Sequence, residues 1–261
     1  MLKKLFPMVL VMFMAVFSTQ AFATIVDSWN YTTASEFISS TYNGTNYTAT
    51  PTELIWGTST GYGRSGLVID PSTVTGDVDT YIGSGVINDP NYWATDISLI
   101  HNNFPITGTY LTATTIQSTV TLTPTSPSWP SLPASSFTFD IKFLETPNSG
   151  WHPSDIFALD GGFPNFNFTL DSQDYFVNAF PSDGSVLYVL PDDVADLVGV
   201  AHGSLGFETA ENQSTILPFA FTISTESIPN DPPPPVPDPS TLLLLGMSLL
   251  GLGFYRRRKK Q

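Results

Sequence analysis

The sequence predicts an all-β protein: a single antiparallel β-sandwich of jelly-roll type, between an N-terminal signal peptide and a short C-terminal transmembrane helix. Three observations support this fold class. Apolar and polar residues alternate along most apolar segments, as in strands with one buried face. Gly, Pro and Asn turns separate these segments at short intervals. The body, residues 24–228, has the size of one domain and shows no internal repeat.

The alternation is clearest in FTFDIKF at residues 137–143, and FNFTL at 166–170 repeats it. SDG at 182–184 and PNSG at 147–150 have the composition of turns. Two short segments favour a helix, residues 34–40 and 192–200. Further strands are expected at residues 54–56, 67–69, 111–122, 175–180, 186–190 and 219–223.

The N-terminus has the three parts of a secretory signal peptide. Lys3 and Lys4 precede an apolar segment, residues 5–17, and Ala21 and Ala23 form an A-x-A cleavage site. An uncleaved membrane anchor is the alternative, but the cleavage site favours removal of residues 1–23. We therefore expect export through the Sec machinery and cleavage by signal peptidase.

The C-terminus combines a rigid linker with a marginal membrane helix. Residues 229–239 are rich in proline, which excludes helix and sheet and favours an extended polyproline II segment. Within the last segment, 240–261, the apolar stretch of about 15 residues covers roughly 22 Å of a hydrocarbon core about 30 Å thick. The basic residues that follow it resist translocation. A short helix of this kind suits temporary anchoring, although a binding motif for a partner domain in the linker and an ordinary tail anchor are alternatives.

This arrangement resembles the PEP-CTERM sorting signal of Gram-negative bacteria, over Val236 to Lys260. Its parts are the motif Pro237, Asp238, Pro239, the apolar helix and a cytoplasmic basic stop of Arg256, Arg257, Arg258, Lys259 and Lys260. Asp238 stands where the family usually has glutamate. The resemblance implies transient anchoring in the inner membrane, cleavage by an exosortase near the motif, and delivery to the cell surface or the exopolysaccharide matrix.

Three segments of the body are similar to a group of PEP-CTERM proteins named for a Thr-His-x-Asn motif. They are residues 55–69, 99–108 and 206–212. His101 and Asn103 match the motif, whereas Ile100 replaces its threonine. No established activity of that group can be transferred to this chain, so the resemblance leaves the chemistry open.

The composition excludes some classes of function. The chain has 23 acidic and 9 basic residues, and Arg64 and Lys142 are the only basic residues in 24–228. Such a surface repels nucleic acid and attracts cations. With no cysteine, the exported domain depends on its core rather than on disulfides.

His101 and Asn103 are expected in a loop, where their side chains would bond backbone groups or bind a ligand or metal. No HxH or HExxH pattern accompanies them. No serine has the glycines of a nucleophile elbow, and no acidic pair stands out for glycosidase chemistry, so we expect no enzyme. Calcium is the one cofactor that the sequence suggests, and the candidate carboxylates are Asp77 with Asp79, Asp155 with Asp160, Asp171 with Asp174, and Asp192 and Asp193 with Asp196. The alternative is a solvated acidic face that keeps an exported protein soluble.

Trp129 and Trp151 lie in turn-rich segments and are candidate platforms for sugar stacking, with packing in the core as the alternative. The sequence thus favours a non-catalytic surface or matrix protein, which contributes to biofilm or cell-envelope architecture. A carbohydrate-binding module that binds exopolysaccharide is the first alternative, and an acid-pair hydrolase is the second. The sequence leaves the ligand, the oligomeric state and the biological role open.

Overall fold

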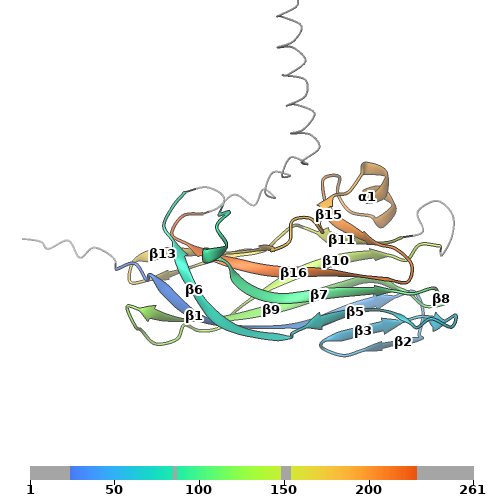
Figure 1. Ribbon diagram of the computed structural model, residues 1–261, viewed down its shortest axis with the longest axis horizontal. Helices are drawn as coiled ribbons and strands as arrows, with labels where there is room; N and C mark the ends of the chain where they lie inside the picture. The colour runs from blue at the N-terminus through green and yellow to red at the C-terminus, as the bar shows by residue number, and fades with distance from the viewer. Residues whose placement is uncertain (1–23, 85–86, 148–153, 228–261) are drawn as a thin grey trace, which may run out of the picture.

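The computed structural model describes residues 24–84, 87–147 and 154–227, and these form a β-sandwich of two long sheets (Figure 1). The first sheet has the order β14-β15-β11-β10-β9-β1-β6, with all neighbours antiparallel. Its strands are β1 Ser28–Tyr42, β6 Thr73–Tyr81, β9 Leu111–Ser126, β10 Ser135–Leu144, β11 Asp155–Asp160, β14 Tyr188–Val189 and β15 Leu205–Thr209.

The second sheet contains β2, β3, β5, β7 and β16 in that order, and β16 also pairs with β13, which pairs with β12. β6 joins the two sheets, because it pairs with β1 and then, at Thr80 and Tyr81, with β16 in parallel. A small ribbon of β4 and β8 lies apart. The bounds are β2 Tyr47–Ala49, β3 Glu53–Trp56, β4 Thr58–Ser59, β5 Ser65–Asp70, β7 Ala94–Asn103, β8 Ile106–Thr107, β12 Asn165–Leu170, β13 Gln173–Pro181 and β16 Gln213–Ser224.

One apolar core fills the space between the sheets. Trp29 and Trp56 are its largest side chains, and both are fully buried. Trp29 lies edge-on to Phe168 and Tyr175, with ring centroids 5.6 and 5.2 Å away. Edge-to-face packing of this kind adds to the free energy gained from area burial alone. The all-β sandwich predicted from the sequence is therefore confirmed.

A short helix covers the outer face of β11. It is α1, Asp192–Val198, and it ends at Gly199, whose φ of 80° lies in the left-handed region that glycine tolerates. Val194 and Ala195 pack in a second small cluster with Ile156 and Ala158 of β11. Because alternate residues of a strand point to opposite faces, the odd-numbered residues of β11, beginning with Asp155, point into the sandwich.

Seven of the eight predicted strand segments lie within strands, and of the eighth, 186–190, only the two residues of β14 are in a strand. The helix predicted at 192–200 is also confirmed, ending two residues earlier at Val198. The helix predicted at 34–40 is wrong, because those residues lie inside β1. There, Thr33, Ser35 and Phe37 are buried alternately, and β9 pairs with the segment except at Ile38, where the register shifts. Tertiary pairing overrides a weak local preference in this segment.

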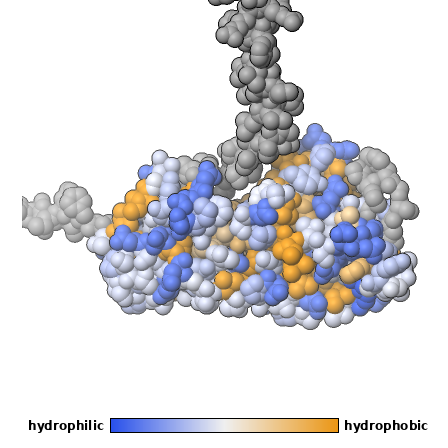
Figure 2. All heavy atoms as spheres, viewed as in Figure 1, coloured by the Kyte–Doolittle hydropathy of each residue, from blue (hydrophilic) through white to orange (hydrophobic). Residues whose placement is uncertain are grey.

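The surface of the described residues is mostly polar, with apolar residues in separate groups on the face that Figure 2 shows. No helix in the described residues is long and apolar enough to cross a membrane. The predicted signal peptide, with Ala21 and Ala23, and the predicted linker, sorting motif and membrane helix at 229–261 lie outside the described residues. A small described η1 turn, Pro90–Tyr92, precedes β7.

Candidate functional site

His101 and Asn103 lie in strand β7 and not in a loop, which corrects the sequence-based expectation. Both side chains are fully buried, because the alternation of β7 directs them into the sandwich together with Leu99. Asn103 donates from Nδ2 to the carbonyl of Thr209 at 2.8 Å, which is the backbone contact expected of it. Neither ring nitrogen of His101 has a hydrogen-bond partner. The imidazole therefore does not have the structural role that a loop position suggested.

Asp155 lies opposite His101 and is the first residue of β11, which belongs to the other sheet. Its Oδ2 lies 3.9 Å from Nε2 of His101, and both side chains are fully buried. Its Oδ1 accepts a hydrogen bond from the backbone N–H of Thr146 at 3.0 Å. One carboxylate oxygen is thus held in place by the chain, while the other faces the imidazole, and the Asp155 carboxyl also interacts with the side chain of Glu145.

Glu145 follows β10 and brings a second carboxyl to the same region. Its Oε2 accepts from Nε1 of the fully buried Trp56 at 3.1 Å, and its Oε1 has no donor. Trp56 lies nearly parallel to the His101 ring, with centroids 6.2 Å apart, and Phe143 lies edge-on to that ring at 5.0 Å. Aromatic rings therefore form the walls around the polar groups.

Glu211 supplies a third carboxyl from the turn between β15 and β16. Both of its oxygens are buried and lack partners, and its negative charge acts on Glu145 and Asp155. We name the set of His101, Asn103, Glu145, Asp155 and Glu211 the inter-sheet cluster. Its residues come from β7, β11 and the segments that follow β10 and β15, so only the packing of the two sheets brings them together.

The inter-sheet cluster is electrostatically unusual. Burial raises the pKa of Asp155, and the negative charge of Glu145 raises it further. Burial also raises the pKa of Glu145, against the opposing effect of the hydrogen bond from Trp56. Burial lowers the pKa of His101 to about 3, so this imidazole is neutral at physiological pH. The three carboxyls thus have no cationic neighbour within the cluster.

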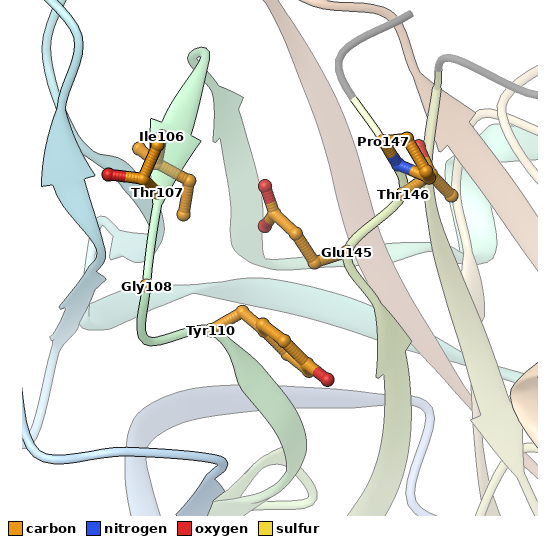
Figure 3. A pocket seen from close by; sticks show the side chains of 7 residues that line it. All are labelled: Ile106, Thr107, Gly108, Tyr110, Glu145, Thr146 and Pro147. Atoms are coloured by element: carbon orange, nitrogen blue, oxygen red, sulfur yellow. The ribbon is translucent and has the colours of Figure 1, made fainter. Parts of the chain in front are cut away.

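A small pocket opens beside Glu145. It has a volume of about 140 Å³ and lies between residues 106–110, which follow β7, and residues 145–147. Figure 3 shows the Glu145 carboxyl pointing into the space between these segments, with the ring of Tyr110 beside it. Its lining residues are Ile106, Thr107, Gly108, Tyr110, Glu145, Thr146 and Pro147. The pocket gives a route from solvent to the edge of the inter-sheet cluster.

The predicted calcium groups do not assemble into a shared site. Asp155 points into the sandwich, whereas the exposed Asp160 lies 4.0 Å from Lys142. Asp196 bonds His202 at 2.9 Å, which raises the pKa of that histidine. Among the described residues, no group of three or more His, Cys, Asp or Glu side chains is placed to hold a metal ion. The remaining predicted carboxylates are Asp77, Asp79, Asp171, Asp174, Asp192 and Asp193.

Of the two tryptophans predicted as sugar platforms, the structure describes only Trp129. Trp129 is half-buried in the loop between β9 and β10, and Trp151 lies outside the described residues. An apolar groove of about 220 Å³ includes Leu132 from the same loop, with Phe166 and Phe168 from β12. This groove was not predicted, because its two sides are distant in sequence.

Sequence reasoning singled out His101 and Asn103 but not Glu145 or Glu211. Asp155 was named only as a partner of Asp160. The resemblance of three sequence segments was the one available signal. The first segment contains Trp56, the second contains His101 and Asn103, and the third contains Glu211. In the structure these residues lie in or beside the inter-sheet cluster. The contacts between the segments required the fold.

Comparison with known protein families places a PEP-CTERM protein-sorting motif at residues 235–259, where the sequence predicted it. The motif accounts for Pro237, Asp238 and Pro239 and for most of the basic stop. No curated protein matches the chain. The chain thus carries a PEP-CTERM protein-sorting motif, while its described domain is characterised by the geometry given above.

Proposed function

We propose that this chain, which carries the PEP-CTERM protein-sorting motif, is a non-catalytic protein of the cell surface or exopolysaccharide matrix of a Gram-negative bacterium. The observation that carries the proposal is the motif at 235–259, which implies recognition by an exosortase and membrane-anchored passage to the surface. The signal peptide predicted at 1–23 supports export through the Sec route. In this proposal the C-terminal helix anchors the chain in the inner membrane only until the exosortase cleaves it.

The described domain supports a role in the matrix. Arg64 and Lys142 are its only basic residues, so it is strongly acidic and stays soluble outside the cell. Glu145 and Asp155 are the carboxyls that could act as an acid pair. Their position argues against polymer hydrolysis, because Asp155 is fully buried and a polymer chain cannot reach it. A hydrolase would instead need both carboxyls on the walls of an open cleft.

The C-terminus of the mature protein tests the sorting step. Mass spectrometry of the protein from fractionated cells should find a C-terminus near Pro237 to Pro239 in the extracellular fraction. In a strain without the exosortase, the full chain should stay in the inner membrane. An intact tail from Arg256 to Lys260 on the extracellular protein would contradict the proposal, as would recovery from the periplasm alone.

Binding of exopolysaccharide is a second candidate function, favoured by the partly exposed aromatic groove at Phe166 and Phe168 and by Trp129, which lies in the same loop as the groove residue Leu132. Aromatic rings bind the apolar faces of sugar rings. Titration of the tryptophan fluorescence with purified exopolysaccharide should show quenching that Trp129→Ala reduces. The exposed Tyr62→Ala is the control, and an unchanged spectrum would exclude this function. A panel of chromogenic glycosides and esters tests the hydrolase alternative.

A further inference from the structure

Three carboxyl groups converge inside the sandwich. Glu145, Asp155 and Glu211 come from the segment after β10, from β11 and from the turn between β15 and β16, and their charges act on one another. Arg64 and Lys142, the only lysine or arginine residues in the described part of the chain, have partners elsewhere. Because a buried charge without a counter-charge is costly, these carboxyls are most stable when they keep their protons.

Glu145 and Asp155 share a hydrogen bond that depends on a proton. Their carboxyl groups are within hydrogen-bonding reach of each other. Ionised carboxylates only accept hydrogen bonds, so the two groups can pair only when at least one of them is protonated. That proton gives partners to buried carboxyl oxygens that otherwise have none. We name the hydrogen-bonded Glu145 and Asp155 the carboxyl pair.

The carboxyl pair connects the two sheets. Oε2 of Glu145 accepts a hydrogen bond from Nε1 of Trp56, which lies in β3 of the second sheet. Oδ1 of Asp155, in β11 of the first sheet, accepts one from the backbone N–H of Thr146. The bond within the pair completes this chain of contacts. Residues 145 and 146 are thus attached to both sheets as long as the proton is present.

The other groups that face the carboxyl pair do not compensate a negative charge. His101 faces Asp155 from β7, but burial lowers its pKa to about 3 and the imidazole is neutral. Glu211 adds a negative charge, which raises the pKa of both carboxyls. Tyr110 is the titratable group beside Glu145 at the pocket (Figure 3). Loss of the proton therefore leaves adjacent like charges in a buried place.

We propose that the carboxyl pair is a pH-sensitive switch: its proton holds residues 145–147 against the sandwich, and loss of the proton releases them and opens the adjacent pocket. These residues form one wall of the pocket of about 140 Å³, so their release widens the route from solvent to the cluster. An exported domain meets the pH of the medium directly. The switch does not depend on the sorting step or on sugar binding.

The direction of the switch follows from the protons bound in each state. Burial raises the pKa of both carboxyls in the closed state, whereas hydrated carboxyls titrate near 4. Opening therefore releases protons. The ratio of open to closed molecules should rise by about 10-fold per pH unit for each proton released, until the closed state also ionises.

Hydrogen exchange of the exported protein, followed by NMR at several pH values, measures the opening. The reporter is the backbone N–H of Thr146, which donates to Asp155. Its protection, corrected for the pH dependence of intrinsic exchange, should fall by about 10-fold or more per pH unit from about pH 5 towards neutrality. Val120, in β9 between β1 and β10, is the reference amide and should stay more protected. Equal protection of both amides would overturn the proposal, because only global unfolding would then break the pair.

Glu145→Gln tests the role of the shared proton. The glutamine amide keeps an acceptor for Trp56 and supplies Asp155 with a donor that does not titrate. The fall in the protection of Thr146 should therefore largely disappear. The same slope as in wild type would overturn the proposal.

Glu211→Gln keeps the carboxyl pair and remains informative if Glu145→Gln does not fold. It removes the neighbouring negative charge, so the pH at which the protection of Thr146 levels off should be lower than in wild type. Glu36→Gln, at an exposed position of β1, is the matched control and should leave the profile unchanged. A Glu211→Gln profile identical to that of wild type would contradict the proposed switch.

Discussion

Nε2 of His101 and Oδ2 of Asp155 face each other at 3.9 Å across the interior of the sandwich, and both side chains are fully buried. The two residues belong to different sheets, β7 and β11. Because the distance exceeds that of a hydrogen bond and the imidazole is neutral, this contact is not an ion pair that holds the sheets together. At this end the interior of the sandwich is polar, because His101, Asn103 and Asp155 are fully buried there.

Trp56→Phe should destabilise the protein more than Trp29→Phe. Both tryptophans are fully buried, and each donates one hydrogen bond from Nε1: Trp56 to the carboxyl of Glu145, and Trp29 to the hydroxyl of Thr80. The loss of a donor to a buried carboxyl should cost about 1 kcal/mol more than the loss of a donor to a hydroxyl. Urea unfolding of the two variants measures the difference, and equal costs would contradict the importance of the Glu145 contact.

Gly206→Ala should weaken the pairing of β15 with β11. A Cβ at Gly206 would lie 2.4 Å from the carbonyl oxygen of Phe157 and 2.8 Å from the side chain of Leu190. The backbone has to shift to accommodate it, at a cost of roughly 1 to 3 kcal/mol or more. Gly184→Ala is the control, because a Cβ there meets nothing within 4 Å and φ is not positive. Thermal unfolding of both variants should show a lowered Tm for Gly206→Ala alone.

Tyr175→Phe should cost about 1 to 2 kcal/mol of unfolding free energy. The Tyr175 hydroxyl accepts a hydrogen bond from the backbone N–H of Val26 at 2.8 Å, and both residues are fully buried. Phenylalanine keeps the ring packing on Trp29 but leaves the N–H without its partner. Tyr62→Phe, at a residue whose side chain is 70% exposed, should change stability by only a few tenths of a kcal/mol. Urea unfolding compares the two.

Asp96→Asn should change the pH dependence of stability. Burial raises the pKa of Asp96 above its ordinary value, with the Tyr31 hydroxyl as the titratable group nearby. A group whose folded-state pKa is raised contributes stability below its unfolded pKa, and this contribution is lost as pH rises through the folded-state pKa. Relative to wild type, Asp96→Asn should therefore gain stability as pH increases from about 4 towards neutrality.

Thermal unfolding at several pH values across that range measures the effect. The Tm of the variant minus that of the wild type should increase with pH and then level off once Asp96 is ionised in both states. A difference that stays constant, or that decreases with pH, would show that the Asp96 carboxyl is not held in its neutral form by burial.

The alternation of apolar and polar residues predicted the location of strands that have one buried face and one face exposed to solvent. Residues 137–143 alternate between large apolar and polar side chains, and they form β10. The pattern fails for β11, which is buried on both faces because α1 covers its outer side. It also fails for β1, where Thr33 and Ser35 occupy interior positions that apolar residues usually fill. Such strands have no periodic signal because tertiary neighbours determine their burial.

The sequence by itself determined the sorting signal and the fold class, because both rest on local order: motif, apolar helix and basic residues at the C-terminus, and period-two alternation in the body. His101 and Asn103 were also singled out in the sequence, but they were expected in a loop. Only the tertiary structure brought them to Asp155, Glu145 and Glu211. The physical reason is that these residues lie up to 110 positions apart and meet only when the two sheets pack and exclude water from the space between them.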